Sequence, residues 1–329
     1  MRPHDVMRQT ETMVKAGAYK VGGAKVVIGK AEQHKSHIRK SKKAYEEAPG
    51  AQMMLPVEVK VVPLDTLDAA YREHCVAVAK GHDDVLRRTA PSAQSLPGQL
   101  GATKPKLKSR SQAPPLQDSP SRVMVLDFAS DTVPGGGARG NQIGTQEESL
   151  CRRSSLLPCL ESLPYPLPFA GCAVCPRVSV FRESEDQRYA LFDPQQGKHP
   201  FNVAVVACAM PSMEGAGGEE EEKVRSTKID IVLREFHAAA QSSGIRSLVL
   251  GAWGCGAFGN DARNVALVFQ RRIQHWFRVA QGPAVTDGDD EEAVSAPCPF
   301  QAEEQPFRIV FAVRGKKNFA AFQTVFSRY

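Results

Sequence analysis

The sequence has no uninterrupted apolar run that is long enough to cross a membrane. Its first residues, Met1 to Asp5, are polar, and no apolar core of a signal peptide follows them. Cysteines are scattered: Cys172 and Cys175 have metal-ligand spacing, but no second pair stands at zinc-finger distance. We therefore expect no metal site, thiols in a reducing compartment, and a cytoplasmic or nuclear protein that acts as a monomer.

Charge of one sign does not dominate either. The chain has 42 basic and 36 acidic residues, so its net charge of +6 alone does not indicate a nucleic acid partner. Residues 30–47 form a very basic stretch, but no aromatic ring is interleaved with the cations between Lys35 and Lys43. We expect a solvated helix face there and no direct binding of nucleic acid or membrane.

One region lacks the composition of a folded segment. Residues 83–121 are rich in Pro, Ser, Gln, Lys and Gly, and apolar residues recur there at no regular period. Such a segment cannot bury enough apolar surface to become ordered. The sequence therefore predicts an N-terminal helical extension over 1–82 that includes a first strand, a disordered insertion over 83–121, and the main domain over 122–329.

Elsewhere, strand patterns alternate with helix patterns. The expected strands are 26–28, 57–62, 123–129, 178–182, 201–209, 247–252 and 308–313. The expected helices are 5–19, 65–80, 147–157, 227–243, 260–281 and 318–326, with solvated loops over 215–222 and 286–304. This alternation indicates an α/β fold with helices on both faces of a sheet, in which loops at the carboxyl ends of the strands carry the ligand site.

Two glycine-rich stretches follow buried strands. Gly135-Gly136-Gly137 comes after the strand at 123–129 and precedes Gln146-Glu147-Glu148, and a second stretch, 253–259, comes after the strand at 247–252. Consecutive glycines let the backbone approach a ligand closely, and exposed N–H groups favour an anion. Two carboxylates beside such a loop suggest chemistry on a phosphorylated sugar, although a glutamate pair in a first helical turn also suits the helix dipole without any catalysis.

The spacing of these motifs resembles one family. Gly-Gly-Gly, eight residues and then Gln-Glu-Glu is similar to the signature of the microbial-type poly(ADP-ribose) glycohydrolases, which have the macrodomain fold. Segments 175–182, 250–261 and 310–313 also look like the family and occur in its order. The resemblance implies a macrodomain-like three-layer α/β/α core with a mixed central sheet, behind an N-terminal helical extension.

The resemblance also implies roles for particular residues. Glu148 would be the general acid that protonates the leaving group and then deprotonates water, and Glu147 would hydrogen-bond the ribose hydroxyls and supply a like charge. Neither a metal nor a nicotinamide is required. The remaining residues would bind substrate, with the first loop around the diphosphate and distal ribose, the second loop over the phosphates and Phe258 against a ribose: Asp127, Gly135, Gly136, Gly137, Gln146, Gly254, Cys255, Gly256, Ala257 and Phe258.

Two departures from the family pattern keep other functions open. Asp127 and Val133 stand where microbial relatives often have asparagine, near the expected place of the terminal ribose. The substrate could therefore be mono-ADP-ribosylated protein, for example on arginine, rather than polymer. A non-catalytic reader of ADP-ribose is a further alternative, against which the intact Gln146-Glu147-Glu148 argues, since binding alone needs no paired acid.

Overall fold

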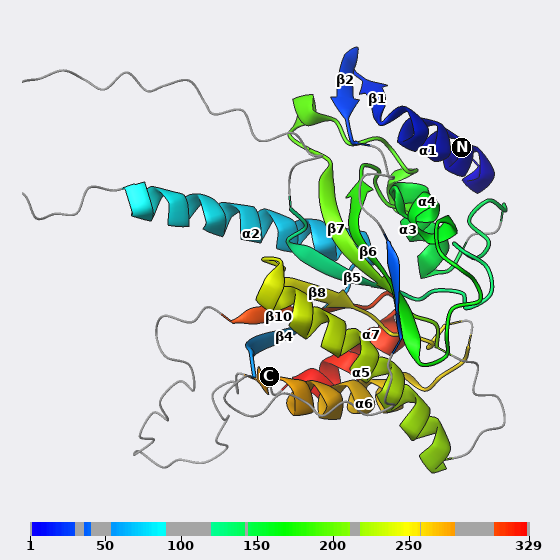
Figure 1. Ribbon diagram of the computed structural model, residues 1–329, viewed down its shortest axis with the longest axis vertical. Helices are drawn as coiled ribbons and strands as arrows, with labels where there is room; N and C mark the ends of the chain where they lie inside the picture. The colour runs from blue at the N-terminus through cyan, green and yellow to red at the C-terminus, as the bar shows by residue number, and fades with distance from the viewer. Residues whose placement is uncertain are drawn as a thin grey trace, which may run out of the picture.

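The computed structural model describes residues 2–29, 36–40, 54–89, 120–141, 144–210, 218–256, 258–279 and 306–327. An eight-stranded mixed sheet lies at its centre, in the order β3-β6-β7-β5-β8-β10-β4-β9 (Figure 1). The strands are β3 (His37–Lys40), β4 (Pro56–Val62), β5 (Val123–Asp127), β6 (Gly171–Val180), β7 (Phe201–Ala207), β8 (Ser247–Leu250), β9 (Arg278–Val279) and β10 (Phe307–Ala312). Strands β7, β5, β8, β10, β4 and β9 run parallel, whereas β6 is antiparallel to β7 and to β3.

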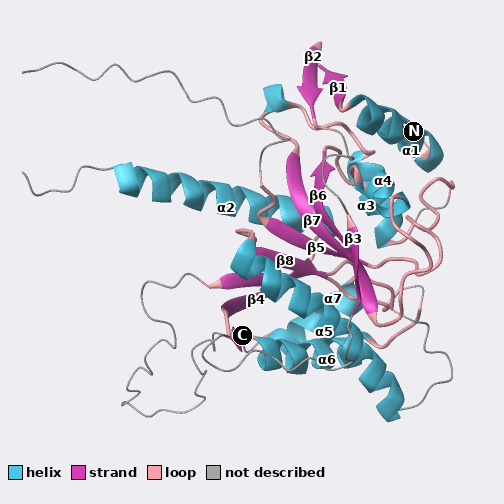
Figure 2. Cartoon of the chain, viewed as in Figure 1, coloured by secondary structure: helices cyan, strands magenta, loops and turns pink. Residues whose placement is uncertain are grey.

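Helices cover both faces of this sheet, which confirms the three-layer architecture. Along β5, Met124 and Leu126 belong to one hydrophobic core, and Val123 and Val125 belong to the other, because successive side chains point to opposite faces. The first core lies under α5 (Gly218–Ser242), α6 (Ala262–Trp276) and α7 (Lys316–Phe326); the second lies under α2 (Thr66–Thr89), α3 (Gln146–Arg153) and α4 (Leu156–Glu161) (Figure 2).

An N-terminal unit packs on the side of α3. Helix α1 (Pro3–Ala16) ends at Gly17, whose φ is 67°, and leads into a hairpin of β1 (Ala18–Val21) and β2 (Ala24–Val27). The buried Thr10 hydroxyl of α1 donates to the carbonyl of Arg152 in α3 at 2.8 Å. Within the predicted region 1–82, α1 packs on α3, and β4 pairs with β10 inside the sheet.

Several predicted boundaries are wrong. Residues 37–40 form the edge strand β3 rather than a helix face, because they pair with β6. Helix α2 continues to Thr89, so residues 83–89 of the predicted insertion are helical, and most of its remainder, 90–119, lies outside the described residues, as does the predicted loop 286–304. Helix α5 begins at Gly218 rather than Thr227, with three glutamates in its first turn, where the helix dipole favours negative charge.

The parallel strands bring their carboxyl ends to one edge of the sheet, where the loops after β5 and β8 meet. None of the helices in the described part of the chain is long and apolar enough to cross a membrane.

Candidate active site

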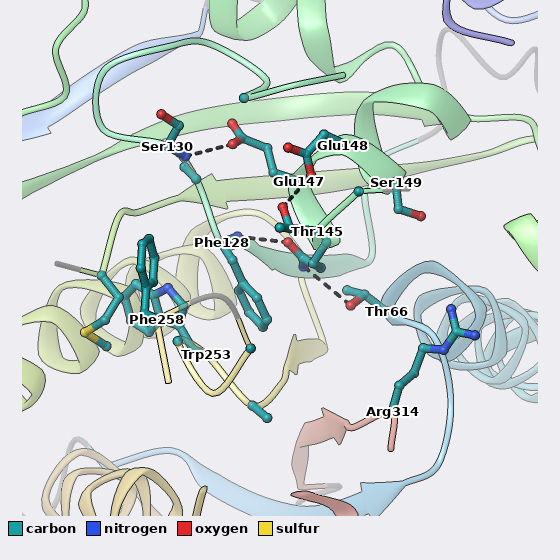
Figure 3. Close-up of a pocket in the computed structure, with 18 of the residues that line it drawn as sticks. Thr66, Phe128, Ser130, Thr145, Glu147, Glu148, Ser149, Trp253, Phe258 and Arg314 are labelled. Atoms are coloured by element: carbon teal, nitrogen blue, oxygen red, sulfur yellow. Dashed lines mark hydrogen bonds between the residues drawn. The ribbon is translucent and has the colours of Figure 1, made fainter. Parts of the chain in front are cut away.

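A cavity of about 720 Å³ lies at this edge, within the size range of small-molecule sites (Figure 3). The segments that follow β4, β5, β7, β8 and β10 all contribute to its wall. They supply Leu64, Asp65, Thr66, Phe128, Ala129, Ser130, Asp131, Gly136, Ala209, Met210, Ala252, Trp253, Gly254, Gly256, Phe258, Ala312, Arg314 and Asn318. The amino end of α3 adds Gly144, Thr145, Gln146, Glu147, Glu148 and Ser149, and Glu185 completes the lining.

The first glycine loop is tied to the glutamate pair. Gly135 and Gly136 have φ values of 73° and 52°, a region that favours glycine. The backbone N–H of Gly135 donates to Glu147 Oε1 at 3.0 Å, and the N–H of Gly137 donates to Glu148 Oε1 at 3.0 Å. The N–H of Gly136 donates to the carbonyl of Val133 at 3.0 Å. All three glycine amides are thus engaged inside the protein, and those of Gly135 and Gly137 position the two acids.

Gln146 joins the start of α3 to the end of β5. Its Oε1 accepts the N–H of Phe128 at 2.9 Å, and its Nε2 donates to the carbonyl of Leu126 at 2.7 Å. Because both ends of the side-chain amide are occupied by β5, Gln146 fixes where the two following glutamates stand.

Glu147 is held on both of its oxygens. Oε2 accepts the N–H of Ser130 at 2.7 Å and Oε1 accepts that of Gly135, and the residue is only 2% exposed. Burial raises the pKa of Glu147 to about 8; the charge of Glu148 adds to this, and the two backbone N–H groups oppose it. Glu147 therefore retains a proton at neutral pH.

Glu148 is the more accessible of the two, at 9% exposure. Its Oε1 accepts the Gly137 N–H, and its Oε2 accepts the hydroxyl of Thr145, the residue that precedes α3. This side chain therefore stands in a fixed orientation at the cavity wall, between the glycine loop and the start of α3.

The second glycine loop forms the opposite wall. Gly254 has φ of 76°, and Phe258 is 42% exposed. The buried Trp253 ring stacks on Phe128, with ring centroids 6.4 Å apart. Among the described residues, no acceptor bonds the backbone N–H of Gly254 or Gly256. This loop, unlike the first, keeps amide donors for a ligand.

Comparison with known proteins shows what this chain and its site are similar to. Residues 7–167, which contain the first glycine loop and the glutamate pair, match the model of the microbial-type PARG catalytic domain. This part of the chain is similar to that family. A search of curated proteins found no match.

Solved structures extend the likeness over the whole chain. Poly(ADP-ribose) glycohydrolase from Thermomonospora curvata is 23% identical, with a TM-score of 0.62, over 98% of this chain and 99% of that chain. The same enzyme with the inhibitor ADP-HPD bound is 24% identical, with a TM-score of 0.61 and the same coverage. The enzyme from Deinococcus radiodurans in complex with ADP-ribose is 20% identical, with a TM-score of 0.54, over 93% and 98% of the two chains. At these identities the likeness shows a shared fold.

The microbial-type PARG motifs meet in space as the sequence predicted, with one clear exception. Gly136, Gln146, Glu147, Glu148, Gly254, Gly256 and Phe258 line the cavity. Gly135, Gly137 and Cys255 belong to the same two loops but are not among the lining residues, and Ala257 lies outside the described residues.

Asp127 is the exception. Its side chain is fully buried and is not among the residues that line the cavity, so its contact with substrate stays a prediction. It lies on the face of β5 that carries Val123 and Val125, beneath α3, because side chains alternate along a strand. Neither of its carboxyl oxygens has a hydrogen-bond partner among the described residues. Burial, and then the charges of Glu147 and Glu148, raise the pKa of Asp127 well above its usual range.

Sequence reasoning missed several residues of the wall. Thr66, Met210 and Arg314 each come just after the carboxyl end of a strand, respectively β4, β7 and β10. The rule that ligand sites lie at strand ends would have found them, but none of them belongs to a glycine motif. No group of His, Cys, Asp and Glu in the described ranges is arranged to hold a metal ion.

Proposed function

We propose that this protein is a poly(ADP-ribose) glycohydrolase, a hydrolase that cleaves the glycosidic bond between ADP-ribose units. The observation that carries this proposal is the buried pair Glu147 and Glu148, held against the first glycine loop at the wall of a nucleotide-sized cavity. The family match over residues 7–167 supports the same reaction.

Glu148 acts as the general acid and base in this proposal. Cleavage of a glycosidic bond passes through an oxocarbenium-like state, so protonation of the leaving oxygen and nearby negative charge both lower the barrier. Glu148 is the more exposed carboxyl, and the Gly137 N–H and the Thr145 hydroxyl hold its two oxygens in place. It protonates the departing oxygen and then takes a proton from the attacking water.

Glu147 has a different part in the reaction. Its oxygens already accept two backbone N–H groups, so it positions the loop against the ribose, and its raised pKa keeps a proton on Glu147 beside the general acid. A carboxylate oxygen has a second lone pair, which leaves room for a ribose hydroxyl as a further donor.

The polymer is favoured over mono-ADP-ribosylated protein as the substrate. Mono-ADP-ribosylated protein was considered as a substrate because Asp127 and Val133 were expected to lie near the terminal ribose. Asp127 is buried beneath α3, and Val133 is not part of the cavity wall, so neither side chain is in a position to select the substrate.

We also propose that the protein works in the cytoplasm or nucleus as a monomer, without binding nucleic acid. The seven described cysteines are free thiols, as a reducing compartment requires.

The direct test uses the wild-type protein with purified poly(ADP-ribose), and in parallel with protein carrying mono-ADP-ribose on arginine, serine or glutamate. Release of free ADP-ribose from the polymer is the expected result, with little release from the three modified proteins. Binding of ADP-ribose without release from any substrate would instead make the protein a reader.

A further inference from the structure

The two walls of the cavity differ in charge. The wall at α3 carries Glu147 and Glu148, and the amides of the first glycine loop are already bonded there. Behind the opposite wall, helix α5 places two buried cations, Arg225 and Lys228, which lie three residues apart and therefore on one face of the helix. An anionic part of a ligand is repelled by the first wall and attracted by the second.

Arg225 is connected to the second glycine loop through Asn260. The Arg225 guanidinium donates to Asn260 Oδ1 at 2.7 Å. Asn260 in turn donates to the carbonyl of Gly254 twice, from its side-chain amide at 3.0 Å and from its backbone N–H at 3.1 Å. A Cβ on Gly254 would lie 2.4 Å from Asn260 Nδ2, so this amide rests directly on the glycine. Arg225 thereby fixes the conformation in which the Gly254 and Gly256 amides remain free.

Charges of both signs lie around this loop: the cations Arg225 and Lys228, and the carboxylates Glu221, which pairs with Arg225, and Asp261, which follows Asn260. Arg225 pairs with Glu221 one turn earlier on α5, but its buried Nε atom has no hydrogen-bond partner among the residues that the structure describes. Lys228 is 3% exposed; it donates to the carbonyl of Phe169 and lies 4.5 Å over that ring, with no carboxylate partner in the described part of the chain. Buried cations are costly unless an anion compensates them.

We infer that Arg225 is a positioning residue for the diphosphate of the substrate: acting through Asn260, it holds the second glycine loop so that its amides bind the phosphates, and its charge attracts them from behind. The inference rests on the proposed function, since it assumes a ligand with a diphosphate. Arg225 does not line the cavity, so it acts on the ligand through the loop rather than by contact. The diphosphate then lies toward α5, and the ribose that is cleaved lies toward α3.

The test compares ligands with and without a diphosphate. We would measure the Kd of ADP-ribose, ADP and adenosine by calorimetry for wild type, Arg225→Gln and Arg225→Lys. A side chain coupled to a site through a hydrogen-bonded network typically changes affinity severalfold to roughly tenfold. Arg225→Gln should therefore weaken the binding of ADP-ribose and of ADP about tenfold and leave the Kd of adenosine unchanged. Arg225→Lys, which keeps the charge, should recover part of the lost affinity. In steady-state kinetics, KM should rise in Arg225→Gln with little change in kcat.

Arg272→Gln is the matched control, because Arg272 also pairs with an α5 carboxylate, Asp230 at 2.7 Å, but has no bond to the second loop. It should leave the Kd of all three ligands unchanged. Equal weakening of all three ligands by Arg225→Gln, or no weakening, would overturn the inference. If Arg225→Gln does not fold, the comparison rests on Arg225→Lys. This variant should weaken the binding of ADP more than the binding of adenosine, and equal changes in the two Kd values would reject the inference. A wild type that fails to bind ADP-ribose would contradict the proposed function itself.

Discussion

Glu148 lies directly against Gly136: a Cβ on this glycine would come within 2.9 Å of Glu148 Oε1. Gly136 also has φ of 52°, which disfavours any residue with a side chain. The distance between the loop and the acid is therefore set by the absence of a side chain at this position.

Gly136→Ala should lower both stability and turnover. The positive φ costs about 1–2 kcal/mol for a residue with a Cβ, and the new methyl group displaces the Glu148 carboxylate. Gly197→Ala is the matched control, because Gly197 has φ of 80° and nothing within 4 Å of its Cβ position. Thermal unfolding should show a lower Tm in both variants, whereas only Gly136→Ala should lose hydrolysis of poly(ADP-ribose). Wild-type turnover in Gly136→Ala would show that the loop does not position the acid.

The raised pKa of Glu147 predicts a pH dependence of stability. Its pKa rises from 4.5 to about 8 on folding, so the folded protein holds a proton that the unfolded chain has released between these values. The contribution of Glu147 to the free energy of unfolding is fully present below pH 4.5 and is lost as the pH rises through about 8. Its size is on the order of 1 kcal/mol for each unit by which the pKa is raised.

Glu147→Gln removes this dependence. Its Tm relative to wild type should therefore increase as the pH is raised from 4.5 to 8, whatever the offset caused by the lost N–H acceptor. Glu219→Gln, at an exposed position of α5, should show no such trend. A difference in Tm between Glu147→Gln and wild type that stays constant over this range would show that Glu147 ionises normally.

Arg139 connects the glycine loop to the N-terminal helix. Its guanidinium lies 2.7 Å from Glu11 of α1 and 2.6 Å from Glu161 of α4, and its backbone carbonyl is 2.9 Å from His4 Nδ1. Arg139→Met should lower kcat severalfold by loosening the loop that holds Glu148. Its effect on stability should stay below about 1 kcal/mol because the ion pairs are exposed.

Arg8→Met serves as the control for Arg139→Met, since Arg8 lies on α1, the helix that Arg139 contacts, and within the described ranges its ion pair is with Asp5 of the same helix, at 3.2 Å. Steady-state kinetics with poly(ADP-ribose) should separate the two variants. Equal kcat values would mean that α1 does not position the loop.

Local sequence patterns predicted most of the helices and strands, because the residues that form these elements themselves show the pattern. The continuous apolar run after residue 122 located β5, and α6 begins close to its predicted start, where the Asp261 side chain accepts the N–H of Asn264. Edge strands escaped prediction, since β3 and β9 are short and depend on pairing with β6 and β4. Their residues carry no strand pattern of their own.

The site was predictable as a set of motifs but not as a set of contacts. The sequence brought the glycines and glutamates together, but it did not indicate that the amides of Gly135 and Gly137 bond to Glu147 and Glu148. Nor did it indicate that Asp127 is buried, because a motif does not say to which face of a strand its residue points. Both features concern the direction of a group, which the packing of α3 on β5 decides.

The catalytic role of Glu148 is tested most directly by Glu148→Gln. Glutamine keeps the shape and can still accept the Gly137 N–H, but it can neither give the proton nor take it back. Turnover of poly(ADP-ribose) should fall by ~10²–10⁴-fold, while the Kd of ADP-ribose measured by calorimetry stays close to that of wild type. Release of ADP-ribose by Glu148→Gln at the wild-type rate would contradict the mechanism and place the acid elsewhere in the cavity.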